Sequence, residues 1–203
     1  MTVNHRTLTG LDLHEPKGAD TAGEGKFYKS DGSGGGTWEF LAHGFGVYVD
    51  SKTTATVQTL SSTPSVIECD SGGGVNEAYL PRAIRGSGHL WDSTNDKVTP
   101  INQGDTYSVR LTFKTYAKAA SPGFVTVVAD TGLPTASTIT LNIGQQQSSL
   151  FATPPTIMSF DFHMAVGPSF FVNGCRFFAF TDTGTLTINE VTLYINRISD
   201  GEG

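Results

Sequence analysis

Histidine is the residue that most often binds metals or transfers protons in proteins. In this sequence the histidines are scattered along the chain. None stands in the close His/His or His/Glu spacing with which a helix presents metal ligands. We therefore expect no metal site and no catalytic histidine, although residues distant in the sequence can converge in a fold. The five histidines are His5, His14, His43, His89 and His163.

The carboxylates show no spacing typical of a catalytic pair. A glycosidase needs two carboxyl groups ~5–10 Å apart across a groove, whereas the glutamates stand singly in separate segments, as at Glu39, Glu68, Glu77 and Glu190. The stretch Asp92–Asp96 resembles an oxygen-rich calcium loop, but Lys97 occupies the position of its glycine and no closing glutamate follows. A turn rich in Asp and Asn is the better interpretation. We expect no enzyme, and a carbohydrate-active enzyme remains a third class of function.

The glycine-rich stretches do not carry a cofactor motif. Gly34–Gly36 and Gly72–Gly74 lack the preceding strand, the following helix and the Lys-Ser/Thr pair of a phosphate-binding loop. Gly86-Ser87-Gly88 lacks the first spacer of a Gly-x-Ser-x-Gly nucleophile elbow. We interpret these stretches as flexible segments and expect no cofactor.

The overall composition excludes several classes of protein. Of 203 residues 24 are glycine and 9 proline, and only 16% are charged, against a usual ~25%. With 37% hydrophobic residues the chain is too apolar to be wholly disordered. It has no triplet glycine period, as in collagen, and no run of ~18 apolar residues that could span a membrane.

The formal net charge of −6 and the two cysteines also limit the partners and the compartment. No stripe of Lys and Arg interleaved with aromatic residues is present, so we expect no nucleic-acid partner. The first six residues lack the apolar core of a secretory signal. We therefore expect synthesis in a reducing cytoplasm, with Cys69 and Cys175 as free buried thiols rather than a disulfide.

The elements that must position any site are predicted to be strands. Apolar and polar residues alternate over 107–114 and 158–164, so that every second side chain lies on one face. Shorter strands are expected near 38–41, 45–49, 54–60, 66–69, 124–129, 137–143, 176–180, 185–188 and 191–195. No stretch favours an amphipathic helix. Many short strands separated by Gly, Pro, Asp and Asn predict an all-β, jelly-roll-like β-sandwich over residues 37–203.

Residues 61–104 are less regular and predict long loops with one or two short strands. Ile84, Leu90 and Trp91 are expected to anchor these loops to the sandwich. Loops of this length are often functional, so the same segment offers a second interpretation. Trp91, His89 and Asp92, or alternatively Tyr79 with Arg82, could form a platform for a sugar.

Seven phenylalanines lie between residues 160 and 180, in the C-terminal third. In a strand, the adjacent pairs Phe170-Phe171 and Phe177-Phe178 direct one ring to each face. One ring of each pair fills the core. The other is buried either against overlying loops or against another subunit, because exposed apolar area costs ~25 cal/mol per Å². We expect a homo-oligomer, with a trimer as the hypothesis.

The first 36 residues hold few large apolar side chains and end in the Gly/Ser-rich run of residues 30–36. Such a segment does not bury enough surface to fold alone. We predict an extended N-terminal arm followed by a flexible tether. The partner-binding residues of this arm are expected to be Leu8, Leu11, Leu13, His14, Glu15, Pro16 and Lys17.

The arm carries a recognisable pattern. Residues 4–10 (NHRTLTG) and 13–19 (LHEPKGA) are followed by Tyr28-x-x-Asp31-Gly32-x-Gly34 and by Trp38. This order resembles the N-terminus of virion proteins of tailed bacteriophages, over about the first fifth of the chain. The resemblance implies a structural virion component with an N-terminal attachment arm. The rest of the chain is similar to phage jelly-roll modules only in its general pattern.

The function that we predict from the sequence is a capsid decoration (cement) protein. The arm would bind the major capsid protein or another virion protein, and the chain would lie on the capsid surface after synthesis in the host cytoplasm. The alternative is a head fibre or tail-associated adhesin whose loops bind a host glycan.

Overall fold

The computed structural model describes residues 26–30, 33, 36–40, 43–52, 56–70, 72–81, 83–115, 123–132, 140–147 and 156–199. The chain divides into two compact units, Met1–Leu41 and Ala42–Gly203. Among the described residues, no helix is long and apolar enough to cross a membrane. The arm residues between Leu8 and Lys17 lie outside the described residues.

The first unit contains an antiparallel hairpin of β1 (Lys26–Ser30) and β2 (Gly36–Phe40). Tyr28 is registered opposite Trp38, and their rings meet edge to face with centroids 5.4 Å apart. The two compact units divide after Leu41, whereas the sequence predicted a boundary between residues 36 and 37. The Gly/Ser-rich run that we interpreted as a tether joins the two strands of this hairpin.

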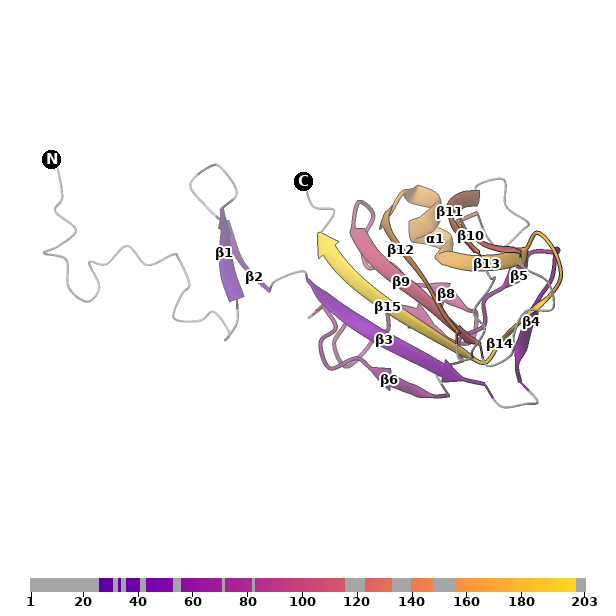
Figure 1. The fold of residues 1–203 in the computed structure, drawn as a ribbon. Coiled ribbons are helices and arrows are strands. Elements are labelled where there is room, and N and C mark those ends of the chain that lie inside the picture. Colours follow the sequence, from indigo (N-terminus) through magenta and orange to yellow (C-terminus); the bar gives the residue numbers. More distant parts are fainter. Residues whose placement is uncertain are drawn as a thin grey trace, which may run out of the picture. The chain divides into compact units, whose positions relative to one another are not determined.

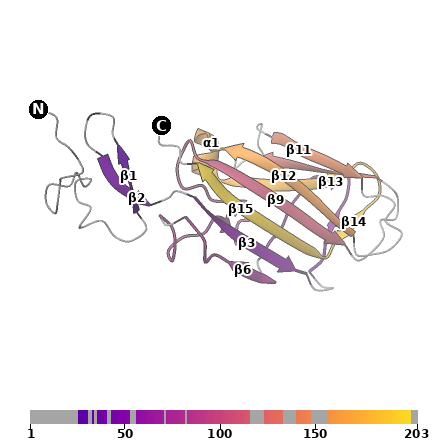
Figure 2. The same ribbon diagram turned by 60° about the vertical axis from the view of Figure 1, so that its left-hand side comes forward.

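The second unit is a sandwich of two antiparallel sheets (Figures 1 and 2). The first sheet has the order β12-β9-β15-β3-β6, made of β12 (Thr156–Ala165), β9 (Thr106–Thr115), β15 (Glu190–Ser199), β3 (Gly44–Ser51) and β6 (Gly74–Asn76). The second has the order β11-β10-β13-β8-β7, made of β11 (Thr140–Gln147), β10 (Phe124–Asp130), β13 (Cys175–Thr181), β8 (Lys97–Val98) and β7 (Trp91–Asp92). In addition, β5 (Ser65–Val66) pairs with β13, and β4 (Gln58–Leu60) pairs with β14 (Leu186–Ile188).

The strand order is that of a jelly roll. In one sheet, β3 and β15, the first and last long strands of the unit, are neighbours, and β9 and β12 continue the sheet beyond β15. In the other sheet, β5 and β8 pair with β13, which is followed by β10 and β11. This exchange of consecutive strands between two sheets is the double Greek key of jelly rolls. The predicted all-β sandwich of jelly-roll type is confirmed.

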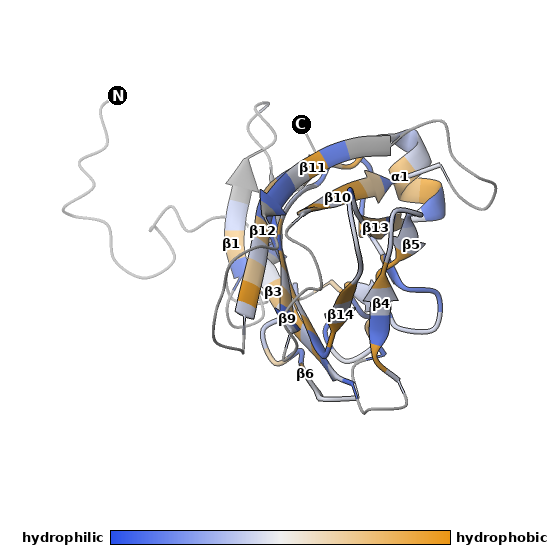
Figure 3. Ribbon diagram, turned by 45° about the vertical axis from the view of Figure 1, so that its right-hand side comes forward, coloured by the Kyte–Doolittle hydropathy of each residue, from blue (hydrophilic) through white to orange (hydrophobic). Residues whose placement is uncertain are grey.

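The core lies between the sheets and follows the predicted alternation. In β9, Tyr107, Val109, Leu111 and Phe113 are fully buried, while the residues between them are more exposed. β12 is registered beside β9 and turns Met158, Phe160, Phe162 and Met164 to the same side. Figure 3 shows β3, β9 and β12 on one side of the sandwich and β10, β13 and β5 on the other.

The two lateral sides of the sandwich differ. On one side, the edge strands β11 and β12 lie close together, and the Gln146 side chain of β11 donates to the Ser159 carbonyl of β12. On the other side, the sheets end in β6 and β7, which are three and two residues long. The sandwich is therefore joined along one side, and short strands border the other.

The structure corrects two local predictions. Residues Pro168–Asn173 form a short helix, α1, where no helix was expected and where Phe170-Phe171 were assigned to a strand. Proline at the first position favours this helix, and Gly174 ends it at φ 79°. The segment 61–104 contains four short strands among its described residues, β5 to β8, rather than one or two. Strands of two or three residues are too short to show a periodicity.

Cys69 and Cys175 are both buried and neither forms a disulfide, as predicted.

Candidate binding pocket

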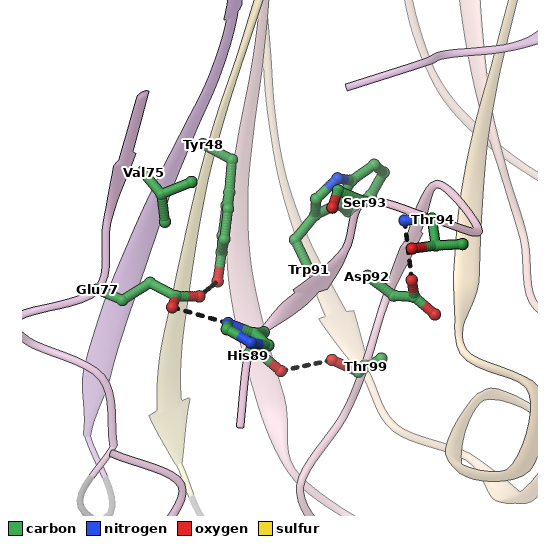
Figure 4. Close-up of a pocket in the computed structure, with 9 residues that line it drawn as sticks. All are labelled: Tyr48, Val75, Glu77, His89, Trp91, Asp92, Ser93, Thr94 and Thr99. Carbon is green, nitrogen blue, oxygen red and sulfur yellow. Dashed lines mark hydrogen bonds and ion pairs between the residues drawn. The ribbon is translucent and has the colours of Figure 1, made fainter. Parts of the chain in front are cut away.

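A pocket of about 680 Å³ opens at the side of the sandwich that β6 and β7 border. The first sheet and the chain just after β6 supply one wall, and β7, its flanking residues and the start of the following turn supply the other. The lining residues are Tyr48, Val75, Glu77, His89, Trp91, Asp92, Ser93, Thr94 and Thr99. Figure 4 shows these side chains. A volume between 300 and 1,000 Å³ is typical of sites for small ligands.

A hydrogen-bonded chain of three side chains crosses the pocket. The Tyr48 hydroxyl donates to Glu77 Oε1 over 2.6 Å and accepts from the Leu90 amide over 3.0 Å. Glu77 Oε2 lies 2.8 Å from His89 Nδ1. Burial, followed by the interaction with Glu77, raises the pKa of Tyr48 well above its ordinary value, so this hydroxyl keeps its proton. The Leu90 amide therefore fixes the Tyr48 hydroxyl, which fixes Glu77, and Glu77 in turn holds the His89 ring.

Gly46 makes room for the buried Tyr48 ring. Both residues lie on the inward face of β3, two positions apart, and a Cβ on Gly46 would come within 2.6 Å of the Tyr48 hydroxyl oxygen. A contact under 3.0 Å requires the ring to move. Glycine at this position is therefore needed for the Tyr48–Glu77 hydrogen bond.

Asp92 is held by the turn that follows β7. Its Oδ1 accepts from the amides of Thr94 and Asn95 over 3.0 and 3.1 Å, and its Oδ2 accepts from the Asn95 carboxamide over 2.7 Å. Burial acts to raise the pKa of Asp92, but these hydrogen bonds and the charge of Lys97 outweigh it and lower the pKa. Asp92 therefore stays ionised at neutral pH, and the predicted Asp/Asn-rich turn is confirmed.

Thr99 and His89 connect the two strands next to the pocket. The Thr99 hydroxyl donates to the His89 carbonyl over 2.6 Å, and the Thr99 amide donates to the Leu90 carbonyl over 3.0 Å. The His89 side chain itself is mostly exposed. This arrangement leaves an imidazole, a threonine hydroxyl and two carboxylates facing one cavity (Figure 4).

Trp91 anchors its loop to the core, as expected from the sequence. Only 2% of Trp91 is exposed, its indole N–H donates to the Cys69 carbonyl over 2.8 Å, and its ring lies parallel to that of Phe177 with centroids 6.3 Å apart. A sugar platform needs an open aromatic face, which this ring does not offer. The alternative role of Trp91 as a platform is therefore corrected, although the residue contributes to the pocket lining.

The other residues named for the two alternative sugar platforms lie in different places. His89 and Asp92 line the pocket. Tyr79 does not line it: its ring stacks on Phe45, with centroids 5.2 Å apart, and is 59% exposed. Arg82 lies outside the described residues. Tyr48, Glu77 and Thr99 line the pocket but were not assigned to it from the sequence. The pattern of residues 45–49 gave no signal for Tyr48, because its apolar residues Phe45, Val47 and Val49 share the face opposite to that of Tyr48, and the structure buries the Tyr48 face.

Two of the four phenylalanines predicted for an oligomer interface lie in the core. Phe177 and Phe170 belong to the core of the sandwich itself, so they are not available to a second subunit. This was the alternative interpretation of the phenylalanines, and it is correct for these two. Phe171 on α1 is 43% exposed, and Phe178 lies half-buried on the outward face of β13.

Among the described residues, no group of three or more His, Cys, Asp and Glu side chains is arranged to hold a metal ion. The pocket does bring two carboxylates, those of Glu77 and Asp92, to one cavity. A glycosidase needs one carboxyl with a raised pKa as its acid, and the lowered pKa of Asp92 excludes that residue from the role.

Comparisons with known proteins find similar folds among solved structures but no match by sequence. No protein-family description and no curated protein sequence matches this chain. Among solved structures, the chain is similar to the vertex protein P5 of PRD1, with 11% identity and a TM-score of 0.45 over 86% of this chain and 82% of that one. It is also similar to Eiger TNF from S. frugiperda, with 11% identity and a TM-score of 0.41 over 79% of this chain and 96% of that one.

Proposed function

We propose that this chain is a non-enzymatic structural component of a tailed-bacteriophage virion, a capsid decoration protein attached by its N-terminal segment. The observation that carries the proposal is the ordered motif of the first 38 residues, which resembles the opening of such virion proteins. In the structure, the last part of this motif has a physical basis, because Tyr28 and Trp38 pair across the β1–β2 hairpin. The description of one fold neighbour as a vertex protein agrees with a virion role, but the proposal rests on the motif.

The division of the chain supports a modular attachment. The motif belongs to the unit Met1–Leu41, and the jelly roll belongs to Ala42–Gly203. A sandwich with its own core does not depend on the arm for folding, so the arm is available for a partner. In this proposal the partner is the major capsid protein or another virion protein, and the sandwich lies on the capsid surface.

The residue types of the arm suit this role. Leu8, Leu11 and Leu13 provide apolar anchors, and Pro16 favours an extended backbone at the residue before it. An extended segment can add a strand to an exposed sheet edge, where main-chain hydrogen bonds give affinity. His14, Glu15 and Lys17 lie in the same stretch and would contribute rim contacts, each of which contributes little.

A homotrimer would strengthen this attachment. Three arms on one particle convert the second and third binding events into intramolecular ones, which raises the overall affinity without new contacts. The exposed Phe171 and the half-buried Phe178 are the remaining candidates for the subunit interface. Light scattering of the full chain at micromolar concentration is expected to give the mass of a trimer, and a stable monomer would refute this part of the proposal.

Attachment is tested by sedimentation with capsids that lack the protein. The full chain should sediment with the capsids, whereas a chain without residues 2–25 should remain in the supernatant and keep its circular-dichroism spectrum and its oligomeric mass. The triple variant Leu8→Ser/Leu11→Ser/Leu13→Ser should lose most of the binding. Ile157→Ser makes the same kind of change at an exposed position on β12 and should bind as the wild type does. Retained binding without the arm would refute the proposal.

The pocket favours a second candidate function, that of a head fibre or tail-associated adhesin that binds a host glycan. The specific observation is the cavity between the sheets, which exposes polar side chains of several kinds. An adhesin predicts that the purified protein competes with the phage for its receptor. Inhibition of phage adsorption by the full chain would support this function, and adsorption unchanged at saturating protein would exclude it.

A further inference from the structure

We propose that the pocket between β6 and β7 binds a neutral, hydroxyl-rich ligand of the saccharide class, with Glu77 and Asp92 as the acceptors of its hydroxyl groups. The inference concerns the pocket alone and is independent of capsid attachment. It gives the glycan-binding alternative a defined site, in which Asp92 was expected from the sequence and Glu77 was not.

The positions of the two carboxylates favour a ligand with several hydroxyl groups. Glu77 follows β6 in the first sheet, and Asp92 belongs to β7 in the second, so they approach the cavity from different sheets (Figure 4). Each is fixed by hydrogen bonds within the protein, Glu77 by Tyr48 and His89 and Asp92 by its own turn. Both carboxylates are already held in place before a ligand binds, so the entropic cost of forming the complex is lower.

Both carboxylates keep the capacity to accept further hydrogen bonds. A carboxylate offers about four lone-pair sites. Glu77 uses two of these sites, one on Oε1 for Tyr48 and one on Oε2 for His89. Asp92 uses three of them, two for the backbone amides of Thr94 and Asn95 and one for the Asn95 carboxamide. Hydroxyl groups of a ligand are the donors that match these remaining sites.

The charge of the lining determines which sugars fit. Of the nine lining residues two are carboxylates, and the basic side chain among them is His89, which is already engaged with Glu77. None is Lys or Arg, the residues that hold carboxylate and phosphate groups in proteins. An anionic sugar would place its charge beside Glu77 and Asp92, where like charges repel. The pocket is therefore expected to select neutral sugars over acidic ones.

The remaining lining groups suit the two faces of a sugar ring. Val75 is half exposed in the edge strand β6 and offers an apolar contact for C–H groups. Ser93, Thr94 and Thr99 add hydroxyl groups to the lining, and hydroxyls both donate and accept. A mixed lining with a small number of polar groups is typical of sites that recognise small polar ligands.

The inference is one of binding without turnover. Hydrolysis of a glycoside needs a protonated carboxyl on one side of the bond and a carboxylate or a water molecule on the other. Asp92 has a lowered pKa and is ionised at neutral pH, so it would not be the proton donor of such a pair. We therefore propose binding alone, and recovery of the intact glycoside tests this point.

Saturation-transfer NMR and calorimetry on the full chain test the inference directly. The probes are the methyl glycosides of glucose, galactose and N-acetylglucosamine, with N-acetylneuraminic acid as the acidic counterpart. We expect saturable binding of at least one neutral probe, with a Kd in the millimolar range or below, and at least tenfold weaker binding of the acid. The bound glycoside should be recovered intact.

Variants then locate the site. Glu77→Gln keeps the shape of the side chain and is expected to weaken binding roughly tenfold or more. Ser93→Trp fills the cavity from an exposed position and should abolish binding without touching the core. Asp161→Asn removes a carboxylate from the outward face of β12 and should leave the affinity unchanged.

Several results would overturn the inference. The first is that none of the three neutral glycosides binds saturably, and the second is that the acid binds as tightly as the neutral sugars. The others are wild-type affinity in both Glu77→Gln and Ser93→Trp, and release of free sugar from a glycoside. A failure of this kind leaves capsid sedimentation unaffected, so it is distinguished from a failure of the proposed structural role.

Discussion

Replacing Arg197 by methionine is expected to destabilise the sandwich strongly, because Arg197 neutralises a fully buried carboxylate. Arg197 Nη2 lies 2.6 Å from Asp105 Oδ1, and its Nε donates to Asp105 Oδ2 over 2.8 Å. Both side chains are almost completely shielded from water. Asp105 also accepts from the Tyr107 hydroxyl and the Asn102 amide. The pair therefore joins the end of β15 to the turn that precedes β9.

The magnitude follows from what the variant leaves behind. Arg197→Met keeps much of the side-chain volume but leaves Asp105 buried without its counter-charge and without the two hydrogen bonds from the guanidinium. Removing one partner of a buried pair typically costs about 3–5 kcal/mol. In a chain of this length such a loss corresponds to a fall in Tm of about 6–20 °C.

A surface pair provides a matched control. Arg110 and Asp161 also approach to 2.6 Å, but their side chains are 62% and 59% exposed. Exposed ion pairs contribute about 0–1 kcal/mol, so Arg110→Met is expected to change the stability little. The two variants remove the same group at the same distance and differ in burial.

Urea denaturation followed by circular dichroism measures both changes in the free energy of unfolding. The double variant Asp105→Leu/Arg197→Met should recover part of the loss, because it removes the uncompensated charge as well. A loss of less than about 1 kcal/mol in Arg197→Met, or a loss no larger than that in Arg110→Met, would contradict the role of Arg197 as the counter-charge of Asp105.

Three further predictions concern the pocket and the core. Gly46→Ala should destabilise the domain by about 1–3 kcal/mol in urea denaturation, because its Cβ would come within 2.6 Å of the Tyr48 hydroxyl oxygen; an unchanged midpoint would contradict this. Asp96→Asn should raise the free energy of unfolding at neutral pH, because burial raises the pKa of Asp96 and ionisation of this carboxyl therefore opposes folding. The asparagine side chain can still accept the hydrogen bond from the Cys69 amide, and asparagine tolerates the backbone φ of 50° at this position. This gain should disappear below about pH 3.9, where the wild-type carboxyl is protonated in both the folded and the unfolded states, and a gain that persists there would contradict the assignment. A thiol reagent should label Cys69 and Cys175 only in denaturant, because both are buried and burial raises the pKa of Cys175; rapid labelling of the folded protein would be the opposite result.

The long strands could be predicted from the sequence because each has a buried and an exposed face. The alternation over 107–114 and 158–164 places the same residues in the core that the structure buries in β9 and β12. Pairing between these strands preserves this alternation, since residues in register share a face. The period of two was therefore enough to assign both the strand type and the inward residues.

Local features that depend on tertiary contacts could not be predicted in this way. The helix α1 has six residues, fewer than two turns, and its inward phenylalanine gives no helical period. The strands β5 and β8 exist because β13 offers them a hydrogen-bonding edge. The hairpin β1–β2 was interpreted as an arm and a tether because its glycine-rich connection is as typical of a linker as of a turn.

The pocket was only partly predictable for the same reason. Tyr48 and Glu77 are 29 positions apart, and they meet because β6 pairs with β3. His89 and Asp92 were assigned to a site from the irregular character of their loop. Trp91 was correctly expected to anchor that loop, but nothing in the sequence showed that its indole lies parallel to Phe177.

The location of the chain in the virus particle is the most direct test of its proposed role. A density map of the virion of the phage that encodes this chain should show jelly-roll density on the outer surface of the head. This density should be connected to the capsid shell through residues 1–41. Density for the chain on the tail alone, or its absence from the purified particle, would contradict the account.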